Sequence, residues 1–283
     1  MAAKHIYTLV IPRFEDIFHG YFAQEIIKGA SITASRLKVD IMIHISERAD
    51  HDDWNHAPGL LPGLSSGILF ADIDRDREGL NRVLMRGIPC LVLNNHFDAP
   101  INYITVENYK ASRRVLKYLV QLGHRRIATI CGDLTTEAGQ ERERGYRDGL
   151  IAEGIPVQDE YIAHGDFMRT PARKAAEKLL SASKRPTAIF AASDVMALEV
   201  IDVAKHLKIK VPEQLSVVGF DDNPLATYSP VPLTTVHQPL AEMSRLGLEA
   251  LHQLVQGKER HPIQKILSAR LIKRDSCSAP LRA

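Results

Sequence analysis

The stretch from 186 to 239, PTAIFAASDVMALEVIDVAKHLKIKVPEQLSVVGFDDNPLATYSPVPLTTVHQP, carries the pattern that decides the fold. Apolar runs of strand length at 187–192 and 215–220 flank an apolar segment of helical length at about 195–207. A strand, a helix and a second strand in this order are typical of a βαβ unit, whose two strands are parallel. We therefore expect an α/β fold built on parallel sheets.

Small polar and acidic residues follow each of these strands. Ser193 and Asp194 follow the first strand, and Asp221 and Asp222 follow the second. Ligands bind at the carboxyl ends of the strands in an open parallel sheet. No nucleophile, metal cluster or phosphate loop accompanies these carboxylates, so the pattern favours a binding site without a cofactor over an enzyme. We expect Asp194 to cap the following helix and Asp222 to order the following loop.

Three segments of this stretch resemble a known family. The sequences AIFAASDVMALEVI (188–201), VPEQLSVVGFDD (211–222) and PLTTVHQP (232–239) resemble the effector-binding core of the lactose/galactose repressor (LacI/GalR) family of bacterial transcription regulators. The resemblance extends from about His5 to about Arg274. No segment resembles the family's helix-turn-helix head and hinge, so we expect that this chain alone does not bind operator DNA.

The resemblance also implies a domain organisation. It implies two Rossmann-like subdomains of the type I periplasmic-binding-protein kind, joined by three crossings of the chain. We place residues 4–106 and 238–266 in the first subdomain and residues 107–237 and 267–276 in the second. Residues 277–283 are expected to form a loose tail.

Two places in the first subdomain are candidate effector contacts. The loop after the first strand contains Arg13, Phe14 and Phe18, and such aromatic and charged groups suit the stacking and orientation of a sugar. Repressors of the resembled family place effector contacts in this loop, although Phe18 can equally begin the core face of the next helix. Asn94 follows the strand at 90–93 and matches a polar effector contact of the family, or else satisfies turn backbone groups.

The second subdomain supplies the other candidates. Arg142 has the spacing R-x-x-G with Gly145, and in relatives the arginine at this position bonds the effector through its planar fork. The alternative for Arg142 is an ion pair with a neighbouring acid on a solvated face, which we expect for Arg144 and Arg147. Phe167, in the sequence GDF, matches an aromatic residue that packs on the effector.

Three further residues complete the predicted site. Asp221 matches the first acid of the family's GFDD segment, which accepts hydrogen bonds from effector hydroxyls. Ser193 departs from the asparagine that relatives commonly carry, so its contact is expected to be lost or mediated by water. Gln238 lies near a crossing of the chain and is the last candidate.

Composition limits the other classes of function. The chain has 283 residues, 45% of them hydrophobic, and a net charge of +2, which is too small to favour nucleic-acid binding by the chain itself. Cys90, Cys131 and Cys277 lie far apart in the sequence, and the first two lie in apolar runs of strand length, so buried thiols in a reducing compartment are expected in place of disulfides. The first apolar run is shorter than the core of an export signal, and no run reaches membrane-spanning length. We therefore expect a cytoplasmic protein.

Two local motifs are coincidental matches. The segment HDDWNH at 51–56 has no metal-ligand spacing, so no metal site is predicted. The segment GLSSG at 63–67 matches the nucleophile elbow, but it precedes a strand where that motif should follow one.

The resulting hypothesis is the sensing core of a transcription regulator, in which closure around an effector changes DNA binding by a separate head. We expect a homodimer and an effector that is a sugar or related polyol, with a purine or an acidic or phosphorylated sugar as alternatives. A free-standing solute-binding protein for a transporter is the alternative function, and the missing export signal counts against it.

Overall fold

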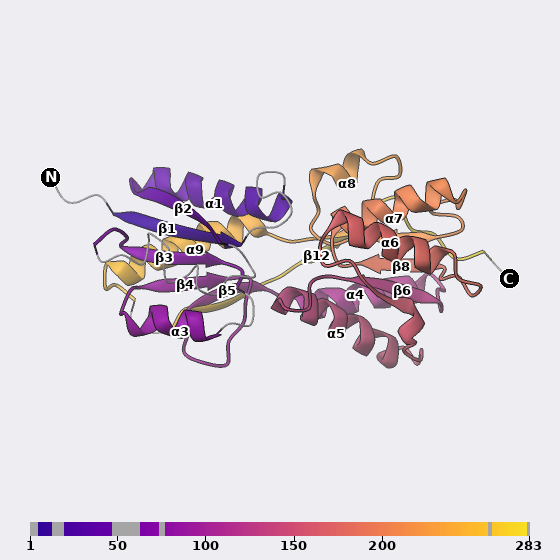
Figure 1. Ribbon diagram of the computed structural model, residues 1–283, viewed down its shortest axis with the longest axis horizontal. Helices are drawn as coiled ribbons and strands as arrows, with labels where there is room; N and C mark the ends of the chain where they lie inside the picture. Colours follow the sequence, from indigo (N-terminus) through magenta and orange to yellow (C-terminus); the bar gives the residue numbers. More distant parts are fainter. Residues whose placement is uncertain (1–4, 13–19, 47–62, 74–76, 260–261, 282–283) are drawn as a thin grey trace. The chain divides into compact units, whose positions relative to one another are not determined.

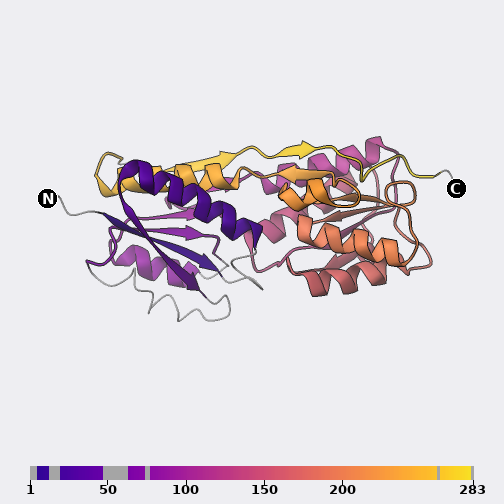
Figure 2. The same cartoon turned by 90° about the horizontal axis from the view of Figure 1, so that it is seen from above.

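The computed structural model describes residues 5–12, 20–46, 63–73, 77–259 and 262–281. These residues form two compact units (Figures 1 and 2).

The chain passes between the two units three times. Unit 1 contains Met1–Val106 and Pro239–Leu267, and unit 2 contains Glu107–Gln238 and Ser268–Ala283. The crossings therefore follow residues 106, 238 and 267, compared with 106, 237 and 266 in the sequence-based assignment.

Unit 1 is built on a six-stranded parallel sheet with the strand order β11-β5-β4-β3-β1-β2. Its strands are β1 (Ile6–Pro12), β2 (Asp40–Ser46), β3 (Gly67–Ala71), β4 (Cys90–Leu93), β5 (Tyr103–Val106) and β11 (Gln264–Leu267). Helices α1 (Tyr21–Leu37) and α9 (Leu240–Val255) pack together on one face, and α3 (Arg77–Met85) covers the other (Figure 2).

Unit 2 is built on a four-stranded parallel sheet with the order β7-β6-β8-β9. Its strands are β6 (Ile127–Cys131), β7 (Ile162–His164), β8 (Ala188–Ala191) and β9 (Ser216–Val218). Helices α4 (Asn108–Gln121) and α5 (Glu137–Ala152) pack together on one face, and α6 (Arg169–Leu180) and α7 (Asp194–His206) on the other (Figure 1). A short helix, α8 (Pro224–Tyr228), follows β9, and η2 (Asp159–Tyr161) precedes β7.

A separate antiparallel ribbon completes unit 2. It pairs β10 (Thr235–His237) with β12 (Arg270–Ile272), and it lies close to two of the three crossings.

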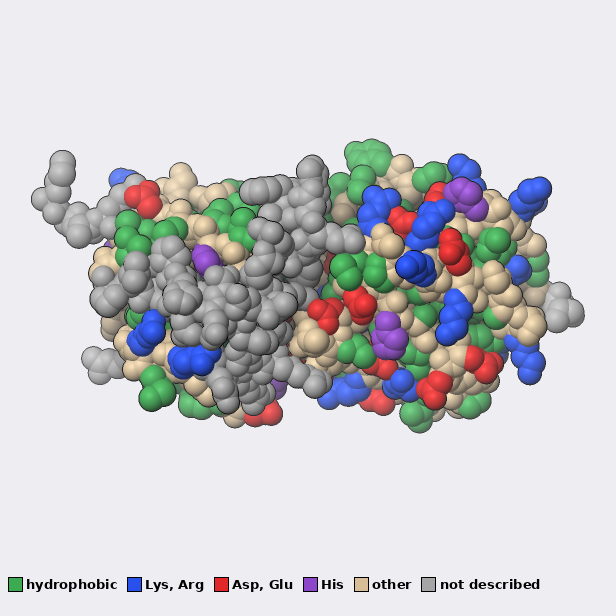
Figure 3. Space-filling model, viewed as in Figure 1, with side chains coloured by type: hydrophobic (Ala, Val, Ile, Leu, Met, Phe, Trp, Pro, Cys, Tyr) green, Lys and Arg blue, Asp and Glu red, His purple; other side chains and the backbone are tan. Residues whose placement is uncertain are grey.

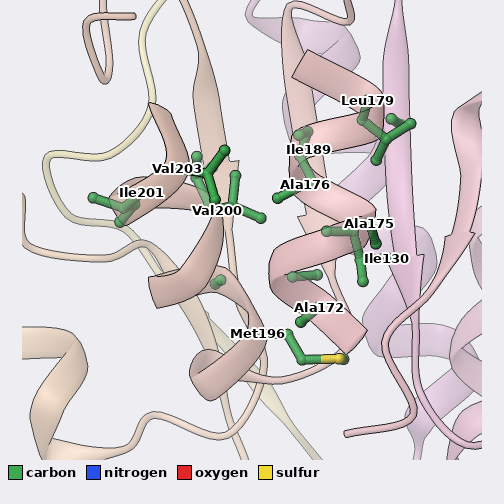
Figure 4. Packing of buried hydrophobic residues seen from close by; sticks show 14 of the residues in the cluster. Ile130, Ala172, Ala175, Ala176, Leu179, Ile189, Met196, Val200, Ile201 and Val203 are labelled. Carbon is green, nitrogen blue, oxygen red and sulfur yellow. The ribbon is translucent and has the colours of Figure 1, made fainter. Parts of the chain in front are cut away.

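The core of unit 2 lies between its sheet and helices α6 and α7 (Figure 4). Ile130 and Ile189 come from the central strands, and Met196 and Val200 come from α7. Helix α6 contributes mainly alanines, among them the fully buried Ala176, and these small side chains let the helix approach closely.

The predicted βαβ unit is confirmed. β8, α7 and β9 follow one another as expected, and β8 pairs with β9 in parallel, with Ala188 opposite Ser216. The predicted α/β fold with parallel sheets and a periplasmic-binding-protein-like architecture is likewise confirmed.

The expectation of a loose tail is wrong for the residues up to Ser278. Just before the predicted tail, the carbonyl of Ser276 accepts a hydrogen bond from the backbone N–H of Val217 in the edge strand β9 (2.9 Å). The backbone N–H of Ser278 donates to the hydroxyl of Ser216 (3.0 Å). A strand edge has unpaired backbone groups, and these polar residues satisfy them without any apolar pattern that a sequence could show.

Candidate functional site

The candidate site lies at the carboxyl edge of the unit 2 sheet. All four strands of this sheet are parallel, so the segments that follow them gather at one edge. Four residues in these segments have backbone φ angles in the left-handed region: Asp166 (51°), Phe167 (61°), Asp221 (133°) and Asp222 (61°). Non-glycine residues seldom adopt this conformation, and where they do the surrounding contacts hold them there.

Helix α5 delivers Arg142 to this edge. The hydroxyl of Thr136 caps the helix by accepting from the backbone N–H of Gly139 (3.1 Å). Two glycines, Gly145 and Gly149, let α5 lie close to α4. A Cβ atom on Gly145 would lie 2.6 Å from the carbonyl oxygen of Tyr109 on α4. Helix α5 is therefore packed closely against α4. Arg142 lies in its second turn and is buried.

The guanidinium of Arg142 is buried and held from several sides. The residue is 4% exposed; Nη1 donates to the carbonyl of Ala192 (2.6 Å), and Nε donates to Oδ1 of Asn108 (2.9 Å). The guanidinium carbon also lies 3.8 Å from the centre of the Phe220 ring, a cation–π contact. The alternative of a solvated ion pair is wrong for Arg142.

That alternative holds for the two neighbouring arginines. Arg144 pairs with Glu141 (3.0 Å), and Arg147 pairs with Glu143 (2.8 Å).

Asp221 lies beside Arg142. One of its carboxylate oxygens is 3.9 Å from Nη1 of Arg142 and accepts a hydrogen bond from the amide of Gln238 (2.6 Å). Burial raises the pKa of Asp221 to about 6, against the opposing effects of Arg142 and Gln238. The carboxylate is therefore ionised at neutral pH and has lone pairs left for hydroxyl donors.

Gln238 presents an acceptor that is otherwise unused. The residue is 3% exposed, and its Oε1 atom is buried without a hydrogen-bond partner among the described residues. A buried polar atom without a partner destabilises the fold because it has lost its hydrogen bonds to water. A ligand that donates a hydrogen bond to Oε1 would remove this penalty.

Phe167 brings an aromatic face to the same place. Its ring centre lies 5.6 Å from the guanidinium carbon of Arg142, and the ring is half-buried against the unit 2 core. Arg142, Phe167, Asp221 and Gln238, which come from four separate segments, therefore meet at one edge.

The capping role expected for Asp194 is wrong. Ser193, not Asp194, is the N-cap of α7, because its hydroxyl accepts from the backbone N–H of Met196 (3.3 Å). Asp194 is fully buried and accepts hydrogen bonds from the backbone of Asn223 (2.7 Å) and the hydroxyl of Thr235. Burial and the charge of Asp221 raise the pKa of Asp194 to about 8. The hydroxyl hydrogen of Ser193 remains available to a ligand.

Asp222 was expected to order the following loop, but its side chain bonds to residues of the antiparallel ribbon and its flank. Its carboxylate accepts hydrogen bonds from Nη2 of Arg274 (2.6 Å) and from Nδ1 of His237 (3.0 Å). It therefore links β10, which contains His237, to the segment that follows β12. Asn108 and Phe220, which hold Arg142, were missed in the sequence. Phe220 was assigned to a strand, and nothing in the spacing links Asn108 to Arg142.

The remaining candidates belong to unit 1. Asn94 ends β4 with a φ of 65°, is 4% exposed, and its Oδ1 has no partner among the described residues. Its neighbour Asn95 bonds both backbone groups of Ile73, in the segment that follows β3. The predicted contacts Arg13, Phe14 and Phe18 lie outside the described residues, as does the segment at 51–56.

Within the described part of the chain, no three histidine, cysteine or acidic side chains are grouped so that they could hold a metal ion. Over the same residues, no helix is both long and apolar enough to cross a membrane.

Known proteins resemble this chain over most of its length. Residues 116–277 match the family model of the periplasmic binding protein-like domain. The chain is 32% identical over 260 residues to the HTH-type transcriptional repressor CytR of Escherichia coli K12, covering 91% of this chain and 76% of that protein. It is 32% identical over 213 residues to the HTH-type transcriptional regulator CelR of Thermobifida fusca, covering 74% of this chain and 63% of that regulator.

A solved structure shows the same fold. The complex of the transcriptional regulator CelR with cellobiose matches with a TM-score of 0.89 and 28% identity, over 98% of this chain and 86% of that one. The chain thus spans less than two thirds of the CelR sequence and about three quarters of CytR.

Proposed function

This chain belongs to the LacI family of transcriptional regulators, and we propose that the carboxyl edge of its unit 2 sheet binds a neutral sugar or related polyol as effector. The observation that carries this proposal is the meeting of Arg142, Phe167, Asp221 and Gln238 at that edge. The alternative of a transporter's solute-binding protein loses its support, because the relatives described above are transcriptional regulators.

The chemistry of the edge suits hydroxyl groups. Asp221 and Oε1 of Gln238 accept hydrogen bonds, the Ser193 hydroxyl donates one, and Phe167 offers an apolar face to the C–H groups of a sugar ring. The relative CelR binds cellobiose, a ligand of this kind.

The charge balance favours a neutral ligand over an acidic or phosphorylated one. The positive charge of Arg142 faces Asp221, and Asp194 is buried behind them. Arg274 is already engaged by Asp222. Among the described residues, the edge therefore has no surplus positive charge for a phosphate. An added anion would raise the pKa of Asp194 and Asp221 further.

The same edge is connected to a crossing of the chain. Gln238 is the last residue of unit 2 before the chain enters unit 1, and its amide bonds to Asp221. An effector that hydrogen-bonds to Asp221 and Gln238 would change the conformation of this crossing. We propose that this is how effector binding alters DNA binding by a helix-turn-helix head in the complete regulator, and we expect such a protein to act in the cytoplasm.

A ligand screen tests the proposal. Thermal unfolding is measured with cellobiose, galactose, glucose 6-phosphate and hypoxanthine, each at several millimolar. A ligand at about a hundred times its dissociation constant stabilises a fold by about 2.7 kcal/mol. We expect a neutral sugar to raise the melting temperature, and the phosphorylated sugar and the purine to have no effect.

Two variants then locate the binding site. Arg142→Ala and Asp221→Ala should each abolish the shift, whereas Arg144→Ala, on the exposed face of the same helix, should leave it intact. If both site variants keep the full shift, the ligand binds elsewhere and the proposed site is wrong. A shift by glucose 6-phosphate alone would contradict the neutral class.

Unit 2 also has a surface suited to a second copy of the chain. A groove of about 670 Å³ lies beside α7 and α8, lined by apolar residues that include Leu198, Ile201 and Val211. Leu225, 58% exposed, and Tyr228, 84% exposed, also line this groove, and Figure 3 shows hydrophobic side chains at the position of α8. A projecting apolar residue beside an apolar groove is self-complementary, as a twofold dimer requires.

We propose that this groove is a homodimer contact. Sedimentation velocity should show a dimer for the natural chain and a monomer for Tyr228→Asp. Ile151→Asp, at an apolar position on α5 that is 64% exposed, serves as the control and should stay dimeric. A Tyr228→Asp variant that remains dimeric would exclude this surface.

A further inference from the structure

The ring of Phe167 occupies the space that a side chain at position 132 would need. Gly132 directly follows β6, the strand next to β7 in the sheet. A Cβ atom built on Gly132 would lie 2.0 Å from Cζ, 2.3 Å from Cε1 and 2.6 Å from Cε2 of Phe167. Heavy atoms that are not bonded do not approach so closely. The tip of the ring therefore lies directly against the backbone of Gly132.

The backbone around Phe167 leaves the ring little freedom to go elsewhere. The backbone N–H of Gly165 donates to the carbonyl of Cys131 (2.9 Å), and that of Met168 donates to the carbonyl of Gly165 (2.8 Å). Between these bonds, Asp166 and Phe167 are both in the left-handed region. Such a conformation persists only where the surroundings determine it.

A second glycine fixes the start of this loop. A Cβ atom on Gly165 would lie 2.6 Å from the sulfur of Met196 and 2.8 Å from Cγ2 of Ile130, so the loop begins in close contact with α7 and β6. The loop that carries Phe167 is thus held at its base, and the absence of a side chain at Gly132 provides the place for its ring.

We propose that Gly132 is a positioning residue of the effector site. By leaving room for the ring, it holds the aromatic face of Phe167 beside Arg142, at 5.6 Å from the guanidinium carbon. It thereby sets the spacing between the stacking surface and the hydrogen-bonding groups Arg142 and Asp221. This inference rests on the proposed function, because the site it tunes is the proposed effector site.

The Gly132→Ala substitution tests the placement of the ring without any ligand. Because an ordinary carbon–carbon contact is about 3.5 Å or longer, the added Cβ must push the ring away by more than 1 Å. The eight phenylalanines are labelled with ¹³C in the ring, and the Phe167 signal is identified by its loss in Phe167→Ala. We expect Gly132→Ala to shift the Phe167 signal and leave most of the others in place.

A matched control separates this effect from general loss of stability. A Cβ atom on Gly149 would lie 2.8 Å from Cβ of Leu116 in the contact of α4 and α5, far along the chain from Phe167. Gly149→Ala should lower the melting temperature and leave the Phe167 signal unchanged. If Gly132→Ala alone does not fold, Gly132→Ala with Phe167→Ala should fold, because the obstructing ring is gone.

Binding of cellobiose, measured by calorimetry, provides the second readout. Gly132→Ala should weaken binding about tenfold in the natural background and cause no further loss in the Phe167→Ala background, since its effect passes through the ring. An unchanged Phe167 signal in Gly132→Ala, or an equal loss of affinity in both backgrounds, would overturn the proposal. If cellobiose does not bind the natural protein, that ligand fails, while the ring signal still decides whether Gly132 places Phe167.

Discussion

The two edges of the unit 2 sheet differ in how fully their buried polar groups are hydrogen-bonded. At the carboxyl edge, the buried Asp194 lies near the half-buried Asp221, and an acceptor of Gln238 has no partner among the described residues. At the amino edge, the buried side chain of His124 is surrounded by partners. Its Nδ1 bonds to Thr187 (2.9 Å), and its Nε2 lies 2.9 Å from the carbonyl of Ser278. One edge holds groups that a ligand would satisfy, and the other is already satisfied and stabilises the fold.

Unsatisfied polar groups at the carboxyl edge are what a binding site would show. Burying unpaired or like-charged groups costs free energy, and proteins keep such groups where function needs them. Cations such as Arg126, Lys184 and Arg185 surround a pocket at the amino edge, where helix carboxyl ends favour positive charge. The contrast between the edges can be tested by substitutions and by pH.

The largest effect is expected from deleting residues 276–283. Ser276 is fully buried, its hydroxyl donates to the carbonyl of Val217 (2.6 Å), and the backbone N–H of Thr234 donates to it (2.8 Å). Leaving several buried groups unpaired should lower the free energy of unfolding by about 4 kcal/mol. Urea denaturation measures this loss. A deletion that costs less than about 1 kcal/mol would mean that these residues are dispensable to the amino edge.

His124→Ala should cost less, about 2–3 kcal/mol, because it removes the buried imidazole and its hydrogen bonds to Thr187 and to the carbonyl of Ser278. His206→Ala, an exposed position on α7, is the control and should change stability by less than about 0.5 kcal/mol. Affinity for the effector should be unchanged in both variants, since neither residue lies at the carboxyl edge. A loss of affinity in His124→Ala would show that the two edges are not independent.

The two edges should also give opposite pH dependences of stability. The pKa of Asp221 is raised to about 6 and that of Asp194 to about 8, so between about pH 4 and 8 the folded state binds more protons at these groups than the unfolded state. Their contribution to stability therefore falls as pH rises. Burial lowers the pKa of His124, so below its unfolded pKa the unfolded state binds the extra proton and stability falls as pH falls.

Unfolding free energies measured from pH 5 to 8 for Asp221→Asn and His124→Gln separate the two contributions. Relative to the natural protein, stability should rise more with pH in Asp221→Asn and less in His124→Gln. Changes of slope in the same direction would contradict the contrast between the edges.

The smallest effect concerns ligand affinity. Because the ionised form of Asp221 accepts from hydroxyls, the affinity for a neutral sugar should be nearly constant above pH 7 and fall below about pH 6, by at most tenfold per pH unit. Calorimetry at pH 5 and pH 7.5 measures this. An affinity that rises on acidification would mean that Asp221 does not accept from the ligand.

The sequence predicted the fold well, because the periodicity of apolar runs reports parallel strands and helices directly. Arg142, Phe167 and Asp221 were predicted as a group because each matches an effector contact of the resembled family. Contacts between distant segments were not predictable. Asn108 holds Arg142 across 34 positions of the chain, and no local pattern records such a partner.

The wrong predictions for the cap of α7 and for the carboxyl-terminal segment also have physical causes. Ser193 and Asp194 are both good capping residues, and only the start of α7 decides which one caps. The segment from Ser276 to Ser278 has no apolar period, so its place on the edge of β9 depends entirely on hydrogen bonds that side chains and backbone form after folding.

The antiparallel ribbon of β10 and β12 has a mechanical consequence. Its two strands end and begin within a few residues of the crossings after Gln238 and Leu267, and three pairs of residues join them. Asp222 adds a bond to His237 on one strand and to Arg274 just beyond the other. Two of the three crossings are thus hydrogen-bonded to each other through the ribbon, so a rotation of one crossing must also rotate the other.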